Sequence, residues 1–308
     1  MQALWMIASS LVFATMGVCV KFASAHFNSA ELVFYRGVIG VIVLAVFARA
    51  RGTSLRTTRP MLAMHGWRSV IGVMSLSAWF YAIAHLPLAT AMTLNYMSSV
   101  WIAAFLVGGS LMLNRARSGP SQGPLVMAIM ASFAGVIMLL RPAIDQNQIF
   151  AGLVGLLSGL GAAFVYIQVM AISRMGEPDT RTVFYFAVGT TIAGGLGMLL
   201  LTGVSPWNWQ HALWLPPVGL LASLGQLFMT RAYAMSSASS AAGNHNGTLL
   251  VANLQYSGII FAAIYGVLLF GDVIPLIGWA GMALIIVSAI AATVLRARAA
   301  PNAPAEEH

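Results

Sequence analysis

The sequence predicts an all-α integral membrane protein with ten transmembrane helices in two inverted five-helix repeats. Three observations lead to this fold class: an excess of apolar residues, long apolar stretches along the whole chain, and short motifs that recur in its second half. Of the 308 residues, 59% are hydrophobic and 7% are charged, whereas soluble domains carry roughly 25% charged residues. The mean hydropathy of +0.86 agrees with this composition. A soluble fold of this size is therefore excluded.

Apolar stretches, separated by polar residues and helix breakers, define the predicted spans. One crossing needs about 20 apolar residues, so a chain of this length has room for roughly ten. The predicted spans lie near residues 3–24, 30–48, 67–86, 88–112, 124–141, 150–173, 182–203, 212–234, 248–271 and 274–295. We therefore predict a first repeat over residues 1–142, a second over 150–296, and a cytoplasmic tail over 297–308.

Arginines mark one side of the predicted bundle, because they flank alternate loops. They are Arg49, Arg51, Arg56, Arg59, Arg68, Arg115, Arg117, Arg174, Arg181, Arg296 and Arg298. Positively charged loops stay in the cytoplasm, so we predict a protein of the bacterial inner (plasma) membrane with both termini cytoplasmic. On this reading the net charge of +8 reflects membrane topology and not a nucleic-acid partner.

Motifs of the first half return in the same order in the second. Val33-Phe34-Tyr35 matches Val183-Phe184-Tyr185, and Tyr96 matches Tyr256. Such self-similarity indicates an internal duplication. Because five spans is an odd number, the second copy would enter the membrane from the opposite side, which gives the inverted repeat of secondary transporters. The second copy also contains an insertion at residues 236–247, which we predict to be a mobile cytoplasmic loop.

Several motifs resemble one transporter family over nearly the whole chain. They are Phe13-Ala14 with Lys21, Phe34-Tyr35-Arg36, Phe133-Ala134-Gly135-Val136, Leu140-Arg141-Pro142, Gln226, Arg231-Ala232-Tyr233 and Phe270-Gly271-Asp272. With them the chain resembles the EamA type of the drug/metabolite transporter superfamily. The resemblance implies two five-helix halves and solute transport, but no particular solute. The family's Gly-Glu pair is present as Gly271-Asp272 in the second copy, whereas the first reads Leu113-Asn114-Arg115 and has no acid.

Ionisable residues inside the predicted spans are functional candidates, because a charge at membrane depth needs a partner or a wet cavity. Lys21 lies near the periplasmic end of the first span, and Arg36 about 10 Å into the second. Arg36 could anchor an anionic or carboxylate-bearing group of the solute, or close the periplasmic half of the cavity through Glu31. Alternatively, Lys21 snorkels to the interface and Glu31 neutralises Arg36 or Lys21 as a structural pair. Phe186 occupies the position that matches Arg36 in the second copy and carries no charge, so we expect the cavity to be electrostatically lopsided toward the periplasmic side.

Polar residues at corresponding depths complete the predicted substrate-binding set, in the arrangement that an inverted two-fold axis would produce. With Lys21 and Arg36, this set comprises Tyr81, Asn95, Tyr96, Tyr166, Gln168, Tyr185, Gln226, Asn253, Gln255 and Tyr256. Any single amide could instead join two helices, at a gain of roughly 1 kcal/mol. Glu31, Arg231 and Asp272 are candidates for gating or charge pairing, although Arg231 fits a topological role first.

These features predict a secondary-active transporter of a small polar or amphipathic metabolite that works by alternating access. Amino acids, nucleoside-type metabolites and drug-like compounds are all candidate solutes, with any coupling ion and either direction. A membrane-embedded enzyme and a channel-like or purely structural helix bundle are the alternatives. An enzyme is disfavoured because the six histidines are scattered singly and the acids lie mostly in loops. We expect no cofactor, no metal and no nucleic acid, with the solute and the bilayer as partners; the coupling ion and the oligomeric state stay open.

Overall fold

The computed structural model describes residues 2–102, 104–105, 123–140, 146–241 and 253–299. These residues form helices joined by short links, with no strand among them. The helices are α1 (Gln2–Ala23), α2 (Ser29–Ala50), α3 (Arg59–His85), α4 (Leu88–Tyr96), α6 (Gly123–Leu140), α7 (Gln146–Arg174), α8 (Asp179–Gly197) with the π-helical turn η2 (Met198–Thr202), α9 (Trp209–Ala212), α10 (Leu215–Ala241), α12 (Ser257–Phe270) and α13 (Leu276–Ala299).

The outer surface of this bundle is apolar. Leu199 and Leu201 in η2 and Leu268 in α12 are 70%, 85% and 75% exposed, which suits a lipid environment. Five helical segments are long and apolar enough to cross a membrane: Ala3–Ala23, Ser29–Ala50, Gln148–Ser173, Asp179–Thr202 and Trp209–Ala232. Shorter apolar helices cover Val126–Leu139, Ser257–Phe270 and Leu276–Ala292. The predicted all-α multi-pass membrane class is thus confirmed, and the count of ten spans stays a prediction.

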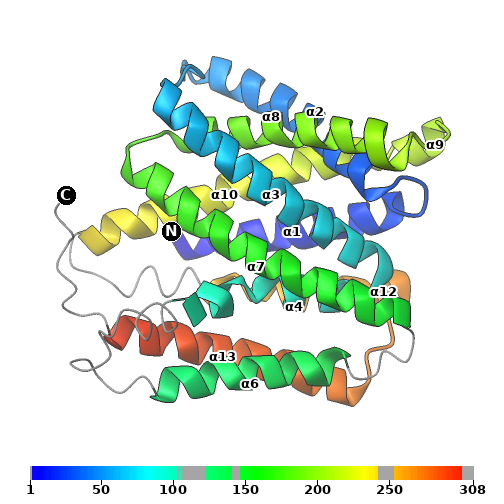
Figure 1. Ribbon diagram of the computed structural model, residues 1–308, viewed down its shortest axis with the longest axis vertical. Coiled ribbons are helices and arrows are strands. Elements are labelled where there is room, and N and C mark those ends of the chain that lie inside the picture. Colours follow the sequence, from blue (N-terminus) through cyan, green and yellow to red (C-terminus); the bar gives the residue numbers. More distant parts are fainter. Residues whose placement is uncertain (1, 103, 106–122, 141–145, 242–252, 300–308) are drawn as a thin grey trace.

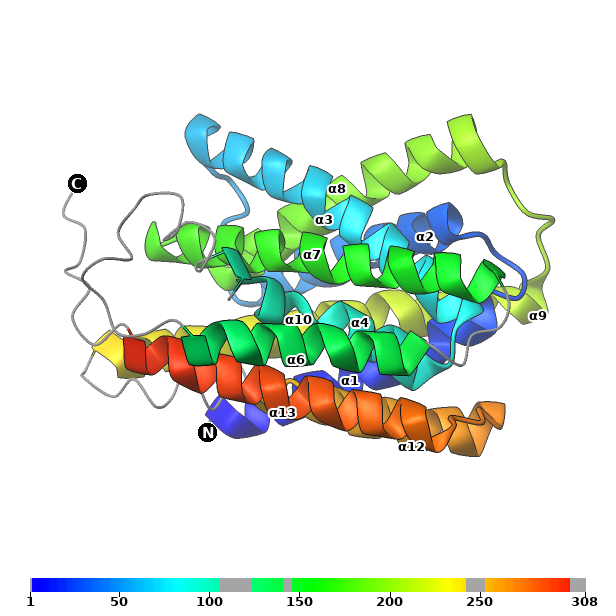
Figure 2. The same ribbon diagram turned by 60° about the horizontal axis from the view of Figure 1, so that its bottom comes forward.

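The main helix pairs each join the first half of the chain to the second. α1 packs against α10, α2 against α8, α3 against α7, α4 against α12, and α6 against α13. Figure 1 shows the α2–α8 and α6–α13 pairs at opposite ends of the molecule, with the other pairs between them. The beginning of α1 and the end of α13 lie at the same end of the bundle in both views (Figures 1 and 2).

Two of the predicted spans, 88–112 and 248–271, are interrupted instead of continuous. α4 ends at Tyr96, and the next bonds run from the Met97 amide to the Leu94 carbonyl and from the Val100 amide to the Met97 carbonyl. The chain tightens in the same way before α12, where the Tyr256 amide donates to the carbonyl of Asn253. Such i to i−3 bonds tighten a helical turn and change the direction of the next residues. The interruption therefore lies at Asn253 and Tyr256, inside the span predicted over residues 248–271.

Two helices extend further than the sequence predicts. α3 begins at Arg59, with Pro60 in its first turn, so Arg68 lies well inside the helix and not at its edge. α10 continues to Ala241, so residues 236–241 are helical where a loop is predicted, and Arg231 does not end its helix. The rest of the predicted insertion, residues 242–247, lies outside the described residues.

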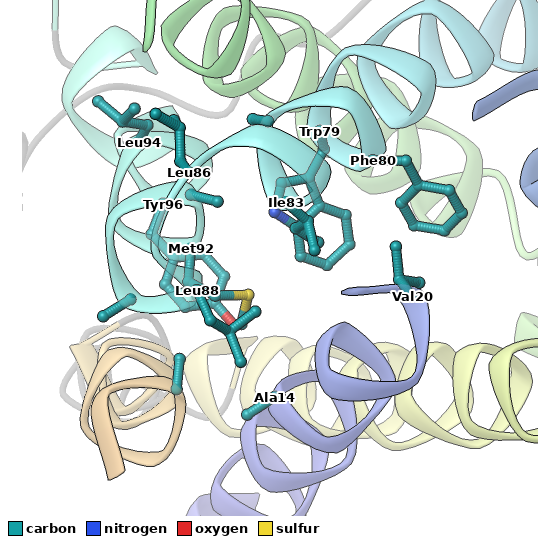
Figure 3. Close-up of a cluster of buried hydrophobic side chains, with 14 of the residues drawn as sticks. Ala14, Val20, Trp79, Phe80, Ile83, Leu86, Leu88, Met92, Leu94 and Tyr96 are labelled. Carbon is teal, nitrogen blue, oxygen red and sulfur yellow. The ribbon is translucent and has the colours of Figure 1, made fainter. Parts of the chain in front are cut away.

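A buried apolar core joins α1, α3 and α4. Trp79, Ile83 and Leu88 gather between these helices (Figure 3), and Ile83 and Leu88 are fully buried. Close helix contacts elsewhere require glycine: a Cβ atom on Gly194 of α8 would lie 2.5 Å from the backbone nitrogen of Phe34 in α2. The glycines of α8 thus serve packing, which brings α2 and α8 together beside a central cavity.

Candidate substrate-binding site

A cavity of about 100 Å³ lies inside the bundle, where α1, α2, α3, α4, α7, α8 and α10 meet. Aromatic and small apolar side chains form most of its wall, and a few polar side chains interrupt it. Its lining residues are Phe13, Arg36, Arg68, Gly72, Ser75, Leu76, Trp79, Asn95, Tyr96, Ala162, Val165, Tyr166, Val169, Phe186, Gln226 and Met229. A mostly apolar pocket with a few placed polar groups is typical of a small-molecule site.

Arg36 reaches this cavity from α2, on the side of the helix that packs against α8. The residue is only 5% exposed, and its guanidinium carbon lies 5.3 Å from the centroid of the Phe186 ring. Its Nε atom has no hydrogen-bond partner among the described residues. Arg36 is thus a buried cation whose hydrogen-bonding capacity is still available.

Arg68 is a second buried arginine of the same cavity, although the sequence predicts only a topological role for it. It is 4% exposed, its guanidinium carbon lies 4.6 Å from the Phe186 centroid, and Nη1 donates to the Thr182 carbonyl at 3.4 Å. The hydropathy pattern begins the third span at residue 67 and therefore leaves Arg68 at its edge. Pro60, a residue favoured in the first turn of a helix, is the signal for an earlier start, which places Arg68 about 13 Å inside.

The two arginines change the expected charge distribution of the cavity. Arg36 comes from the predicted periplasmic side and Arg68 from the predicted cytoplasmic side, so with this topology the cavity is not charged on one side alone. Because both guanidinium carbons lie close to the ring centroid of Phe186, they are within about 10 Å of each other. At that distance or less, two positive charges repel by at least about 1.7 kcal/mol at an effective dielectric constant of about 20. Among the described residues, no carboxylate forms an ion pair with either arginine.

Polar side chains opposite the arginines are held by neighbours. Asn95 donates from Nδ2 to the Ser158 hydroxyl at 3.1 Å, and Gln255 donates from Nε2 to the Tyr166 hydroxyl at 3.4 Å. Tyr96 meets Tyr256 edge to face, with 6.5 Å between ring centroids. The cavity thus brings together Arg36, Asn95, Tyr96, Tyr166 and Gln226 of the predicted set, with Gln255 and Tyr256 directly behind.

Lys21 and Asp272 lie outside the cavity and form an ion pair at 3.2 Å. Lys21 also donates to the Leu86 carbonyl at 3.1 Å, and the Leu88 amide donates to Asp272 at 2.9 Å. The pair therefore ties the end of α1 to the α3–α4 link and to the chain just beyond α12. Asp272 and Lys21 are thus ion-pair partners, and a gating role for Asp272 stays a prediction.

The predicted contact of Glu31 with Arg36 or Lys21 is wrong. Glu31 occupies the third position of α2 and forms a capping box with Asn28, because its carboxylate accepts a hydrogen bond from the Asn28 amide at 2.8 Å. The same carboxylate accepts from the Ser205 amide at 2.7 Å and from its hydroxyl at 2.6 Å. Glu31 therefore fastens the link after η2 to α2 and leaves Arg36 without an acid.

Five further predicted residues also lie away from the lining of the cavity. Tyr81 stacks on His85 in α3, Tyr185 donates to the Leu55 carbonyl at 3.0 Å, and exposed Arg231 lies over the ring of Trp5. Gln168 and Asn253 each bury a side-chain oxygen that has no partner among the described residues. The structure thus separates a central group from residues that serve helix ends and packing.

An apolar-surfaced helical bundle around a positively charged central cavity defines a multi-pass membrane protein with a small-molecule site. Comparison with known proteins identifies the family: residues 1–141 match the model of the EamA-like transporter family. The chain is 31% identical over 286 residues to the pseudopaline exporter of Pseudomonas aeruginosa, covering 92% of this chain and 93% of that protein. The chain belongs to the EamA-like transporter family, as its motifs indicated.

Two further relatives and one solved structure agree with this assignment. The chain is 28% identical to a riboflavin transporter of Rhizobium johnstonii, over 77% of this chain and 75% of that protein. It is 25% identical to a riboflavin transporter of Vibrio cholerae, over 93% and 90% respectively. A solved crystal structure shares the fold with a TM-score of 0.64 at 19% identity, covering 96% of this chain and 98% of that one. The protein is thus a membrane transporter for a small-molecule solute.

Proposed function

We propose that this protein is a secondary-active transporter that moves a small metabolite bearing an anionic group across the bacterial inner membrane by alternating access, with both termini in the cytoplasm. The observation that carries the proposal is Arg36, a buried guanidinium that faces the central cavity without a carboxylate partner among the described residues. An ionised side chain at membrane depth costs folding free energy, so such a residue is a functional candidate.

An anionic group of the solute would complete the hydrogen bonding of Arg36. The guanidinium presents a planar fork of donors that matches a carboxylate or a phosphate in two parallel bonds. Phe186 supports the guanidinium from one side through a cation–π contact, which holds it in place when the cavity is empty. The neutral polar groups at Asn95 and Tyr166 would orient the rest of the solute.

The relatives and the fold support the transport cycle. The named relatives export pseudopaline or transport riboflavin, which are small solutes like the one proposed here. The interrupted helices at Met97 and at Tyr256 lie beside the cavity, as broken helices do in secondary transporters. The chain carries no phosphate-binding glycine-rich loop, so we assign the driving force to a solute or ion gradient.

Transport by Arg36 variants tests the proposal. Purified protein in liposomes is supplied with a metabolite mixture, and the compounds that cross are identified by mass. For such a solute we expect Arg36→Lys to transport more slowly, because it keeps the charge but loses the planar fork. Arg36→Gln should lose most activity at equal membrane abundance. Arg49→Gln is the matched control, since Arg49 is exposed on the same helix. Equal rates in all four proteins would contradict the proposal.

A further inference from the structure

We propose that Arg36 and Arg68 form one two-cation site around Phe186 and that this site selects solutes carrying two anionic groups. The inference rests on the proposed function and names the solute class more narrowly. Arg68 thereby becomes a specificity-determining residue, with Arg36 holding the first anionic group and Arg68 the second.

The shared contact with Phe186 joins the two arginines into one site. The two guanidinium carbons lie 5.3 and 4.6 Å from the centroid of the same ring, and both side chains line the same cavity. Both residues are nine-tenths or more buried. Arg36 comes from α2, Arg68 from α3 and Phe186 from α8, so the pairing depends on the tertiary fold and not on neighbouring positions in one helix.

The two charges face the cavity without an acid to balance them. Four acids lie among the described residues, and three of them are engaged elsewhere: Glu31 with Ser205, Glu177 with His65, Thr57 and Arg181, and Asp272 with Lys21. The fourth, Asp179, begins α8 and forms no ion pair with either arginine. No acid of the described chain therefore neutralises the two buried positive charges, and a dianionic solute would neutralise both.

The arginines also keep hydrogen-bond donors free. The Nε atoms of both arginines are buried and have no hydrogen-bond partner among the described residues. Arg68 makes one long bond, to the Thr182 carbonyl at 3.4 Å. A structural arginine normally satisfies its donors with carbonyl or carboxylate oxygens, so donors held ready beside a cavity indicate ligand binding.

Three probes with one carbon skeleton and different charge test the inference: glutarate, its monoamide and its diamide. Binding to the purified full-length chain is measured by the rise in melting temperature with probe concentration. A second charge-assisted contact is worth a tenfold or greater gain in affinity. For wild type we expect the apparent Kd of glutarate to be at least tenfold lower than that of the monoamide, and the monoamide to bind more tightly than the diamide.

Variants separate this inference from the proposed function. Arg68→Gln should bind glutarate and the monoamide equally while still preferring the monoamide over the diamide, and Arg68→Lys should keep part of the preference for glutarate. Arg49→Gln, with its exposed side chain on α2, is the control for general charge loss. If wild type binds glutarate no more tightly than the monoamide, the two-anion inference is overturned. A single carboxylate that bridges both arginines would give this result. The proposed function is tested separately, by comparing transport in wild type and Arg36→Gln.

Discussion

At the scale of single residues, three of the four described carboxylates hold helix ends together, away from the cavity. Glu31 fastens residue 205 to the start of α2, and Asp272 joins the end of α1 to the α3–α4 link. Glu177 accepts hydrogen bonds from Thr57 and Arg181 between the α2–α3 link and the start of α8. Because these carboxylates are paired elsewhere, the positive charge of the cavity is available to a solute.

Glu177 predicts a pH dependence of stability. Burial alone would raise the pKa of its carboxyl, but hydrogen bonds from His65 and Thr57 and the charge of Arg181 outweigh burial and lower this pKa below its usual value of 4.5. Because the folded pKa lies below the unfolded one, the ionised carboxylate stabilises the fold above the unfolded pKa, and this contribution is lost as the pH falls through the folded pKa. We expect the melting temperature to fall as the pH drops below about 5, through the unfolded and then the folded pKa, and to fall less in Glu177→Gln.

The control is the comparison of the melting temperatures of wild type and Glu177→Gln across this pH range. Glu177→Gln should already be less stable than wild type at pH 7, because His65, Thr57 and Arg181 lose a charged acceptor. Once the pH is below the folded pKa of Glu177, the two melting temperatures should converge. Parallel curves over the whole range would show that Glu177 adds no pH-dependent stability.

Sequence patterns predict the buried arginine of α2 but not its partner in α3. Arg36 stands inside a long apolar run, where any charge is conspicuous. Arg68 comes shortly after an arginine-rich link that resembles a cytoplasmic loop, so the positive-inside rule explains it without a cavity. Its approach to Phe186 depends on how α3 packs on α8, and no local pattern encodes that. Side-chain partners such as Asp272 for Lys21 are likewise set by tertiary contacts 251 residues apart in the chain.

At the scale of helices, the contact of α2 with α8 positions both Arg36 and Phe186. The helices approach most closely at Gly37 and Gly194, where an added Cβ atom on either would lie 2.5 Å from backbone nitrogen of the partner helix. The motif repeats predict that these helices correspond, because Val33-Phe34-Tyr35 and Val183-Phe184-Tyr185 lie in them. The interruptions in the fourth and ninth predicted spans cannot be predicted in this way, because residues 94–100 and 253–257 contain neither proline nor glycine as a helix breaker.

Alanine at Gly194 should loosen this contact. A methyl group there meets the backbone of Phe34, which cannot yield as a side chain can, and overpacking of this kind costs about 1–3 kcal/mol. Gly66 of α3 is the matched control, because a Cβ atom there would meet nothing within 4 Å. Where there is room for the methyl group, replacing glycine by alanine inside a helix stabilises the helix by up to about 1 kcal/mol. We expect Gly194→Ala to lower the melting temperature and Gly66→Ala to keep or raise it. Equal shifts in both would refute the close-packing argument.

At the scale of the whole molecule, the pattern of helix pairs is the one that a two-fold rotation would produce. Matching the halves in order relates α1 to α7, α2 to α8, α3 to α10, α4 to α12 and α6 to α13. The observed pair α1–α10 then maps onto the observed pair α3–α7, while α2–α8, α4–α12 and α6–α13 map onto themselves. The inverted duplication over residues 1–142 and 150–296 is a prediction that this closed set of contacts favours.

Membrane topology gives the decisive test of the inverted halves. The α2–α3 link and the segment around α9 occupy corresponding places in the two halves, so an inversion puts them on opposite sides of the membrane, whereas a parallel repeat puts them on the same side. Thr58 and Gln210 are exposed residues of these two segments. The chain has a single natural cysteine, Cys19, which is buried, so an introduced thiol reports its own position. In intact cells we expect an impermeant thiol reagent to label Gln210→Cys and to leave Thr58→Cys unlabelled until the membrane is permeabilised, because the arginine-rich link stays in the cytoplasm. Labelling of both positions from outside would refute the inverted arrangement, and labelling of Thr58→Cys alone would reverse the proposed orientation.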